Sequence, residues 1–213
     1  MKTANISALI LFLFASALVA KAEEARPPAL NPDGQKFLFV VDTSASMQRL
    51  PHNGRQTVFD MIYSGLWNQL APGDSIGVWT FNQDVQAGKF AMQVWDPDQD
   101  LALASRVGLF LKGQHYEHKA QLNEAFKSAL GLVKSVKDLN VLVITDGQSS
   151  LGQSKLEIAL KDRYQTMAEQ ARKGNKPMVL AFHAIGGEVL TNWVTLAGEP
   201  IKFPKPLAKK KLL

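Results

Sequence analysis

Oxygen-bearing side chains follow a short apolar run near the start of the chain. Residues 37–41 are all aliphatic or aromatic, and Asp42, Ser44 and Ser46 follow at alternate positions. Such an apolar run predicts a strand that is buried on both faces of a sheet. Carboxylate and hydroxyl oxygens are hard ligands that suit Mg²⁺, Mn²⁺ or Ca²⁺. The pattern predicts a cation site at the end of a central strand, although these residues could simply end the strand and cap the next helix.

A second apolar run repeats the pattern about a hundred residues later. Residues 140–144 are followed by Thr145, Asp146 and Gly147. In open α/β sheets, ligands bind beyond the carboxyl ends of the strands, where the strand order reverses. In the order 3-2-1-4-5-6, the strands that end at Asp42 and Asp146 are neighbours, so both carboxylates face one crevice. Close carboxylates repel each other unless a cation or a shared proton lies between them, which favours a metal.

The remaining sequence predicts the elements that position these carboxylates. Before the second run, the spacing of apolar residues predicts a helix over 59–70, a hairpin over 75–95, and helices over 96–111 and 122–133. After it, the pattern predicts a helix over 156–171, a strand over 178–185, a short helix over 188–196 and an edge strand over 200–203. Together these elements predict an α/β fold with a doubly wound, mostly parallel six-stranded sheet of Rossmann-like type. One antiparallel edge strand and helices on both faces are expected.

Composition divides the chain into four segments. A basic start, an apolar run over 6–19 and a small-x-small sequence ending at Ala22 predict a signal peptide over 1–22. A Pro-rich leader over 23–34, a domain over 35–204 and a basic tail over 205–213 follow. No second apolar stretch of transmembrane length is present in the sequence. We therefore expect the export signal to be cleaved near Ala22 and the protein to be periplasmic or secreted.

The charge distribution argues against nucleic-acid binding. The formal net charge is +5, but seven lysines lie in the signal peptide and after residue 201, so the rest of the chain is nearly neutral. The Lys-rich tail could make weak contact with an anionic surface. The sequence contains no cysteine, and it lacks both a G-x-S-x-G elbow and a complete phosphate-binding loop, so we do not expect an enzyme.

The run Asp42-Thr43-Ser44-Ala45-Ser46-Met47, together with Ile144-Thr145-Asp146-Gly147, resembles the von Willebrand factor type A domain over roughly residues 35–204. The resemblance implies a metal-ion-dependent adhesion site formed by a D-x-S-x-S loop, a threonine from a second loop and an aspartate from a third. Carried over, it makes Asp42, Ser44, Ser46 and Asp146 the ligands of a divalent cation. Mg²⁺ is expected, with Mn²⁺ or Ca²⁺ as alternatives, and the implied partner is a protein that presents Glu or Asp to the cation.

The second loop departs from the family pattern. Ala120 stands where the family has its threonine, so water, Gln121 or a group of the partner must supply the missing oxygen. The residues expected to contact a partner are Met47, Ala120, Gln121, Gly147 and Gln148. Two alternatives stay open: a metal-free scaffold with a degenerate site, and a metal-dependent phosphate-ester hydrolase. The hydrolase needs an acidic group two residues after Asp42, where this chain has Ser44.

Overall fold

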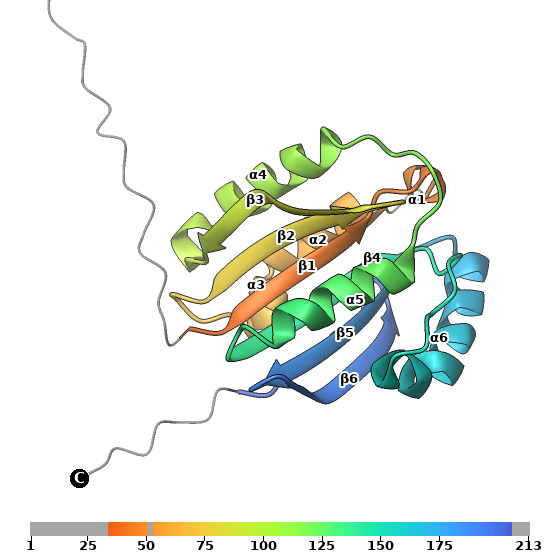
Figure 1. The fold of residues 1–213 in the computed structure, drawn as a ribbon. Helices are drawn as coiled ribbons and strands as arrows, with labels where there is room; N and C mark the ends of the chain where they lie inside the picture. Colours follow the sequence, from red (N-terminus) through yellow and green to blue (C-terminus); the bar gives the residue numbers. More distant parts are fainter. Residues whose placement is uncertain (1–33, 51–52, 206–213) are drawn as a thin grey trace, which may run out of the picture.

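The computed structural model describes residues 34–50 and 53–205 (Figure 1). Its strands are β1 (Lys36–Asp42), β2 (Ser75–Phe81), β3 (Val85–Val94), β4 (Asp138–Thr145), β5 (Met178–Ile185) and β6 (Glu188–Leu196). Its helices are α1 (Ala45–Gln48), α2 (Gly54–Tyr63), α3 (Gly65–Asn68), the 3₁₀ turn η1 (Pro97–Gln99), α4 (Asp100–Lys112), α5 (Leu122–Val133) and α6 (Lys155–Gly174). The predicted signal peptide, almost all of the leader and all but the first residue of the tail lie outside the described residues.

The six strands form one sheet in the order β3-β2-β1-β4-β5-β6, in which the first five strands have the predicted order and the sixth comes from another segment than predicted. β1 lies at the centre and pairs in parallel with both β2 and β4. Val41 is opposite Ile144 in this pairing, so the two apolar runs end side by side at one edge of the sheet. We call this edge, formed by the carboxyl ends of β1, β2 and β4 and the loops that follow them, the rim.

The sheet is mixed, and the prediction of a mostly parallel sheet with one antiparallel edge strand is wrong. The pairs β2/β3, β4/β5 and β5/β6 are all antiparallel. Thr145, the last residue of β4, is opposite Met178, the first residue of β5. The segment that joins these strands therefore returns to the rim, at the edge where it began, and makes no crossover to the opposite end of the sheet.

The last part of the chain also differs from the prediction. Residues 188–196, expected as a helix, form β6, which makes a hairpin with β5. The turn is Gly186-Gly187, and both residues have positive φ, which glycine adopts without steric cost. Residues 200–203, expected as an edge strand, have no assigned secondary structure. The paired glycines and the β-branched residues that follow them were a hairpin signal that the helix prediction overlooked.

The helix predicted over 59–70 ends earlier, at Tyr63. Residues 65–68 then form one left-handed turn, with φ of 51° at Leu66, 58° at Trp67 and 63° at Asn68. A non-glycine residue in this conformation costs on the order of 1–2 kcal/mol. Burial of the Leu66 side chain in the core offsets part of that cost.

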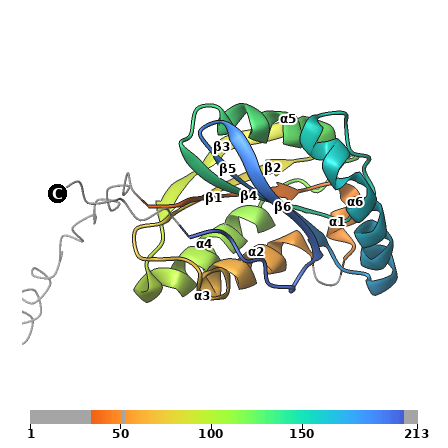
Figure 2. The same ribbon diagram turned by 90° about the horizontal axis from the view of Figure 1, so that it is seen from below.

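Helices cover both faces of the sheet, as predicted (Figure 2). On one face, α2 and α4 pack over alternate residues of the central strands, including Phe37, Phe39 and Leu142. On the other face, α5 and α6 pack over the intervening residues, including Leu38, Val141 and Phe182. Within the described ranges, no helix is both long and apolar enough to cross a membrane.

The segment after β6 runs back from the rim across the face that α2 and α4 cover. Gln69 holds it by accepting a hydrogen bond from the Phe203 backbone at 2.9 Å and donating one to the Ile201 carbonyl at 2.6 Å. The Phe203 ring lies edge-on to Phe37, with centroids 5.6 Å apart. Gln35 donates to the Pro204 carbonyl at 3.0 Å, so both ends of the described chain lie at the end of the sheet opposite the rim (Figure 1).

Phe203 should therefore contribute to stability as a core residue. We expect Phe203→Ala to lower the free energy of unfolding by about 3 kcal/mol, because it leaves a cavity between Phe37 and Trp193. Urea denaturation would measure the change. Lys202→Ala, at an exposed neighbouring position, is the matched control and should change stability by less than about 0.5 kcal/mol. Equal effects of the two substitutions would contradict the packing described for this segment.

Candidate metal centre

The first loop of the site begins where β1 ends. Asp42 is fully buried, and one of its oxygens accepts the backbone N–H of Ser44 at 2.8 Å. The hydroxyls of Ser44 and Ser46 lie 3.1 Å apart. Ser44 occupies the N-cap position of α1, but its side chain makes no capping hydrogen bond. The simple capping role considered for Ser44 is therefore not what its side chain does, and the two hydroxyls face each other instead.

The third loop begins where β4 ends. Thr145 donates its hydroxyl proton to the second oxygen of Asp42 at 2.7 Å, which links the two strand ends directly. Asp146 is 4 % exposed, and its Oδ1 accepts the backbone N–H of Gln148 at 2.9 Å. Its Oδ2 is buried and has no hydrogen-bond partner among the described residues. A buried carboxylate oxygen without a partner is costly, so this atom is a candidate ligand.

The two carboxylates influence each other. Burial raises the pKa of Asp42 to about 6, and the nearby charge of Asp146 adds to the rise. The hydrogen bonds that Asp42 accepts from Ser44 and Thr145 oppose this effect without cancelling it. A divalent cation at this position would be attracted to both carboxylates, and it would compete with the proton for Asp42.

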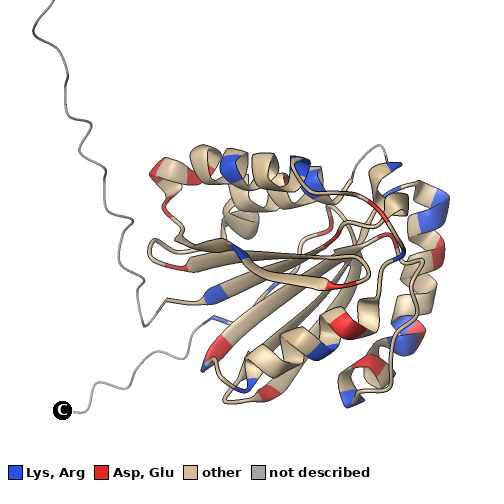
Figure 3. Ribbon diagram, turned by 45° about the horizontal axis from the view of Figure 1, so that its top comes forward, with Lys and Arg blue, Asp and Glu red and all other residues tan. Residues whose placement is uncertain are grey.

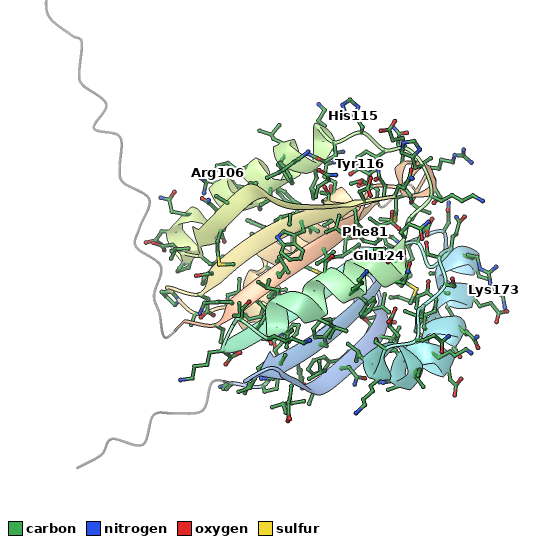
Figure 4. All side chains as sticks on the ribbon, in the orientation of Figure 1. Phe81, Arg106, His115, Tyr116, Glu124 and Lys173 are labelled. Carbon is green, nitrogen blue, oxygen red and sulfur yellow. The ribbon has the colours of Figure 1, made fainter. Side chains whose placement is uncertain are left out.

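The second loop, residues 113–121, crosses the rim next to the first. The Glu117 N–H donates to the Thr43 carbonyl at 3.1 Å, and the Ala45 N–H donates to the His118 carbonyl at 3.2 Å. His115 and Tyr116 lie in this loop, with His115 at the outer edge of the molecule (Figure 4). These backbone contacts bring Ala120 to the site, where its methyl group offers no oxygen.

A cavity of about 370 Å³ lies between the three loops. Five of the predicted ligands and contacts line it: Ser46, Asp146, Ala120, Gln121 and Gln148. The Ala120 carbonyl accepts the hydroxyl of Ser149 at 2.7 Å. The structure therefore brings together residues that the sequence placed in three separate loops.

Two other predicted contacts lie elsewhere. Met47 is fully buried and packs in the core with Val41 and Ile144, so the prediction of a partner contact at this residue is wrong. The sequence did not indicate that Met47 is buried, because the Met47 side chain lies beside Gly54, which belongs to the next helix. Gly147 lies at an adjoining cavity, with a φ of +74° that favours glycine.

The roles of three residues of the site were not predicted from the sequence. Thr145 bonds to Asp42, and Ser149 joins the third loop to the second. Tyr164 of α6 donates its hydroxyl to the Ser149 carbonyl, and burial raises the pKa of this phenol. Thr145 and Ser149 could have been suspected from their places beside Asp146, whereas nothing in the sequence pattern connects Tyr164 to this loop.

The donor set fits a hard divalent cation. Two carboxylates and two hydroxyls lie at the rim, and the unpartnered Oδ2 of Asp146 is the kind of atom that a cation would satisfy. The described residues contain no group of three or more His, Cys, Asp or Glu side chains that could hold a metal. A cation held here would therefore need the hydroxyls as ligands, with water or a partner completing the coordination shell.

Comparison of the sequence with models of known protein families finds no match. Comparison with curated proteins finds no match either.

The buried charge of Asp42 should make stability depend on pH in the absence of divalent cations. Because folding raises the pKa of Asp42 from 3.8 to about 6, the native state binds the proton more tightly than the unfolded state. The protonated carboxyl therefore stabilises the fold at low pH. The free energy of unfolding falls by roughly 3 kcal/mol as pH rises from about 4 to about 6.

Asp42→Asn isolates this contribution, because an amide can accept from Ser44 and donate to Thr145. In EDTA, the wild type should lose about 3 kcal/mol relative to Asp42→Asn between pH 4 and pH 6.5, as measured by urea denaturation. Asp162→Asn, on the exposed face of α6, is the control and should run parallel to the wild type. A constant difference between wild type and Asp42→Asn would show that burial does not perturb this carboxyl.

Proposed function

We propose that this protein is an exported module that binds another protein through a divalent cation at the rim. Asp42, Ser44, Ser46 and Asp146 hold the cation, with Mg²⁺ the first choice and Mn²⁺ or Ca²⁺ as alternatives. The observation that carries the proposal is the buried, unpartnered Oδ2 of Asp146 beside a second buried carboxylate. The strand order and the three-loop arrangement support a relationship to the von Willebrand factor type A domain.

The bound cation would keep positive character and would attract a carboxylate from the partner. The protein's own contribution is to hold the ligand oxygens in place. Thr145 fixes the orientation of Asp42, the N–H of Gln148 fixes that of Asp146, and the contact between the Ser44 and Ser46 hydroxyls sets their spacing. An open cavity of about 370 Å³ leaves room for a partner's side chain and for water.

A metal-free scaffold is the second candidate, and Ala120 is the observation that favours it. Without an oxygen at this position, the protein supplies fewer ligands than a hard cation needs, so affinity could fall below a useful level. A phosphate-ester hydrolase has weaker support, because position 44 carries a hydroxyl where that chemistry needs an acid.

Cation titration separates the first two candidates. We expect Mg²⁺ to bind with measurable heat and to stabilise the fold by about 2.7 kcal/mol at a free concentration of 100 times its Kd. Asp146→Asn and Ser44→Ala should remove both effects because each removes a ligand, whereas Asp162→Asn should retain them. Calorimetry that detects the same heats in the wild type and in Asp146→Asn would eliminate cation binding at this site.

Ala120→Thr tests the incomplete second loop as a gain of function. The added hydroxyl lies beside the cavity and should tighten Mg²⁺ binding roughly tenfold, equivalent to about 1.4 kcal/mol. Ala120→Val has nearly the same shape without the oxygen, so it is the matched control and should leave affinity unchanged or weaker. Equal affinities of the two variants in calorimetric titrations would mean that residue 120 does not face the cation.

Partner binding needs its own experiment. Capture from an envelope extract in Mg²⁺ should recover a protein that is lost in EDTA and is not recovered by Asp42→Asn. Recovery that is equal with and without the chelator would favour the metal-free scaffold.

A further inference from the structure

A second cavity adjoins the cation site at the rim. It has a volume of about 420 Å³ and is lined by Gly147, Gln148, Tyr164, Gln165, Ala168 and Arg172. Gln148 lines both cavities, so a ligand that enters one can continue into the other across this exposed side chain. Two of the proposed cation ligands, Ser46 and Asp146, line the first cavity, and Arg172 is the only cationic residue that lines the second.

Arg172 is oriented by its own helix. Its Nε donates to the Ala168 carbonyl at 3.4 Å, which leaves the terminal nitrogens of the guanidinium for another acceptor. The neighbouring Lys173 is paired with Glu169 at 2.8 Å. Among residues 34–50 and 53–205, neither Arg172 nor Lys119 of the first cavity has a carboxylate oxygen within 4.0 Å, and the charge of Arg172 interacts at longer range with Glu169. Figure 3 shows basic positions along α6 and on the loops beside it.

The topology of the sheet puts this arginine at the rim. Because β5 runs antiparallel to β4, α6 ends at the edge where β4 ends, and its last turn carries Arg172 and Lys173. A guanidinium presents a planar pair of N–H donors that matches a carboxylate. The two adjoining cavities therefore combine a site for one carboxylate at the cation with a separate hydrogen-bond donor, Arg172, for a second carboxylate.

We propose that the partner presents an acidic peptide segment with two carboxylates, one at the cation and the other on Arg172. This inference rests on the proposed function and adds the chemistry of the partner to it. A segment with a single acidic residue would use only the first cavity and would bind less tightly. The second carboxylate would also select among acidic partners by the spacing of their charges.

Short fluorescent peptides test this proposal by anisotropy in Mg²⁺ and in EDTA. The probes are Gly/Ser peptides with one Glu, and peptides in which a second Glu follows two, three or four residues later. We expect Mg²⁺-dependent binding of all probes, and about fivefold tighter binding for the best two-Glu spacing than for the single Glu. Arg172→Gln should remove this gain while retaining the Mg²⁺ dependence.

Arg163→Gln is the matched control, because Arg163 lies on the same helix but bonds to Asn192 of β6. It should leave the gain intact. In Arg172→Glu, a probe with Lys in place of the second Glu should bind more tightly than the two-Glu probe, which reverses the wild-type preference.

The outcomes distinguish this inference from the proposed function. If no probe binds more tightly in Mg²⁺ than in EDTA, both the proposed function and this inference are overturned. If the single-Glu probe shows Mg²⁺-dependent binding but the second Glu adds as much in Arg172→Gln as in the wild type, only the role of Arg172 is overturned. Failure of the reversed preference in Arg172→Glu would also count against direct pairing at this residue.

Discussion

The hydrogen bond from the Thr145 hydroxyl to the Asp42 carboxylate joins two strand ends that are 103 residues apart in the chain. It exists because β1 and β4 pair in parallel and end level with each other. The same pairing buries Asp42 completely and holds Asp146 nearby. Water cannot solvate the charge that results, so a proton or a cation must compensate it. The folding of the central strands thus buries carboxylate groups at the rim, next to the loops that surround them.

The direction of the strands beyond β4 determines where α6 ends relative to the rim. A crossover connection would have ended α6 at the opposite end of the sheet, far from the carboxylates. The antiparallel pairing of β4 with β5 returns the chain to the rim, where Gly147 packs against Ala168 and Met178. A side chain at Gly147 would meet both of these residues at less than 3.0 Å, so this packing depends on glycine. Asp146 and Arg172 thereby line two cavities that share Gln148, although they come from different elements of the fold.

The sequence predicted the order of the first five strands and the proximity of Asp42 to Asp146, because two similar apolar runs ended in carboxylates. It did not predict the direction of β5, since an apolar run such as residues 178–185 is equally suited to a parallel or an antiparallel neighbour. The helix prediction over 188–196 gave too little weight to the two glycines before it. Met47 was misplaced because its packing partners, among them Ile144, lie far away in the chain. Contacts of that kind depend on tertiary structure, which local patterns do not encode.

The two ends of the described part of the chain bear on how the rim can be presented. Gln35 and Pro204 are hydrogen-bonded at the end of the sheet opposite the three loops. A surface, a bead or a fused protein joined directly before Gln35 or after Pro204 would therefore be held behind the described domain, with the loops directed outward. Such an attachment would display the rim to the surroundings, whichever of the two ends carries the tether.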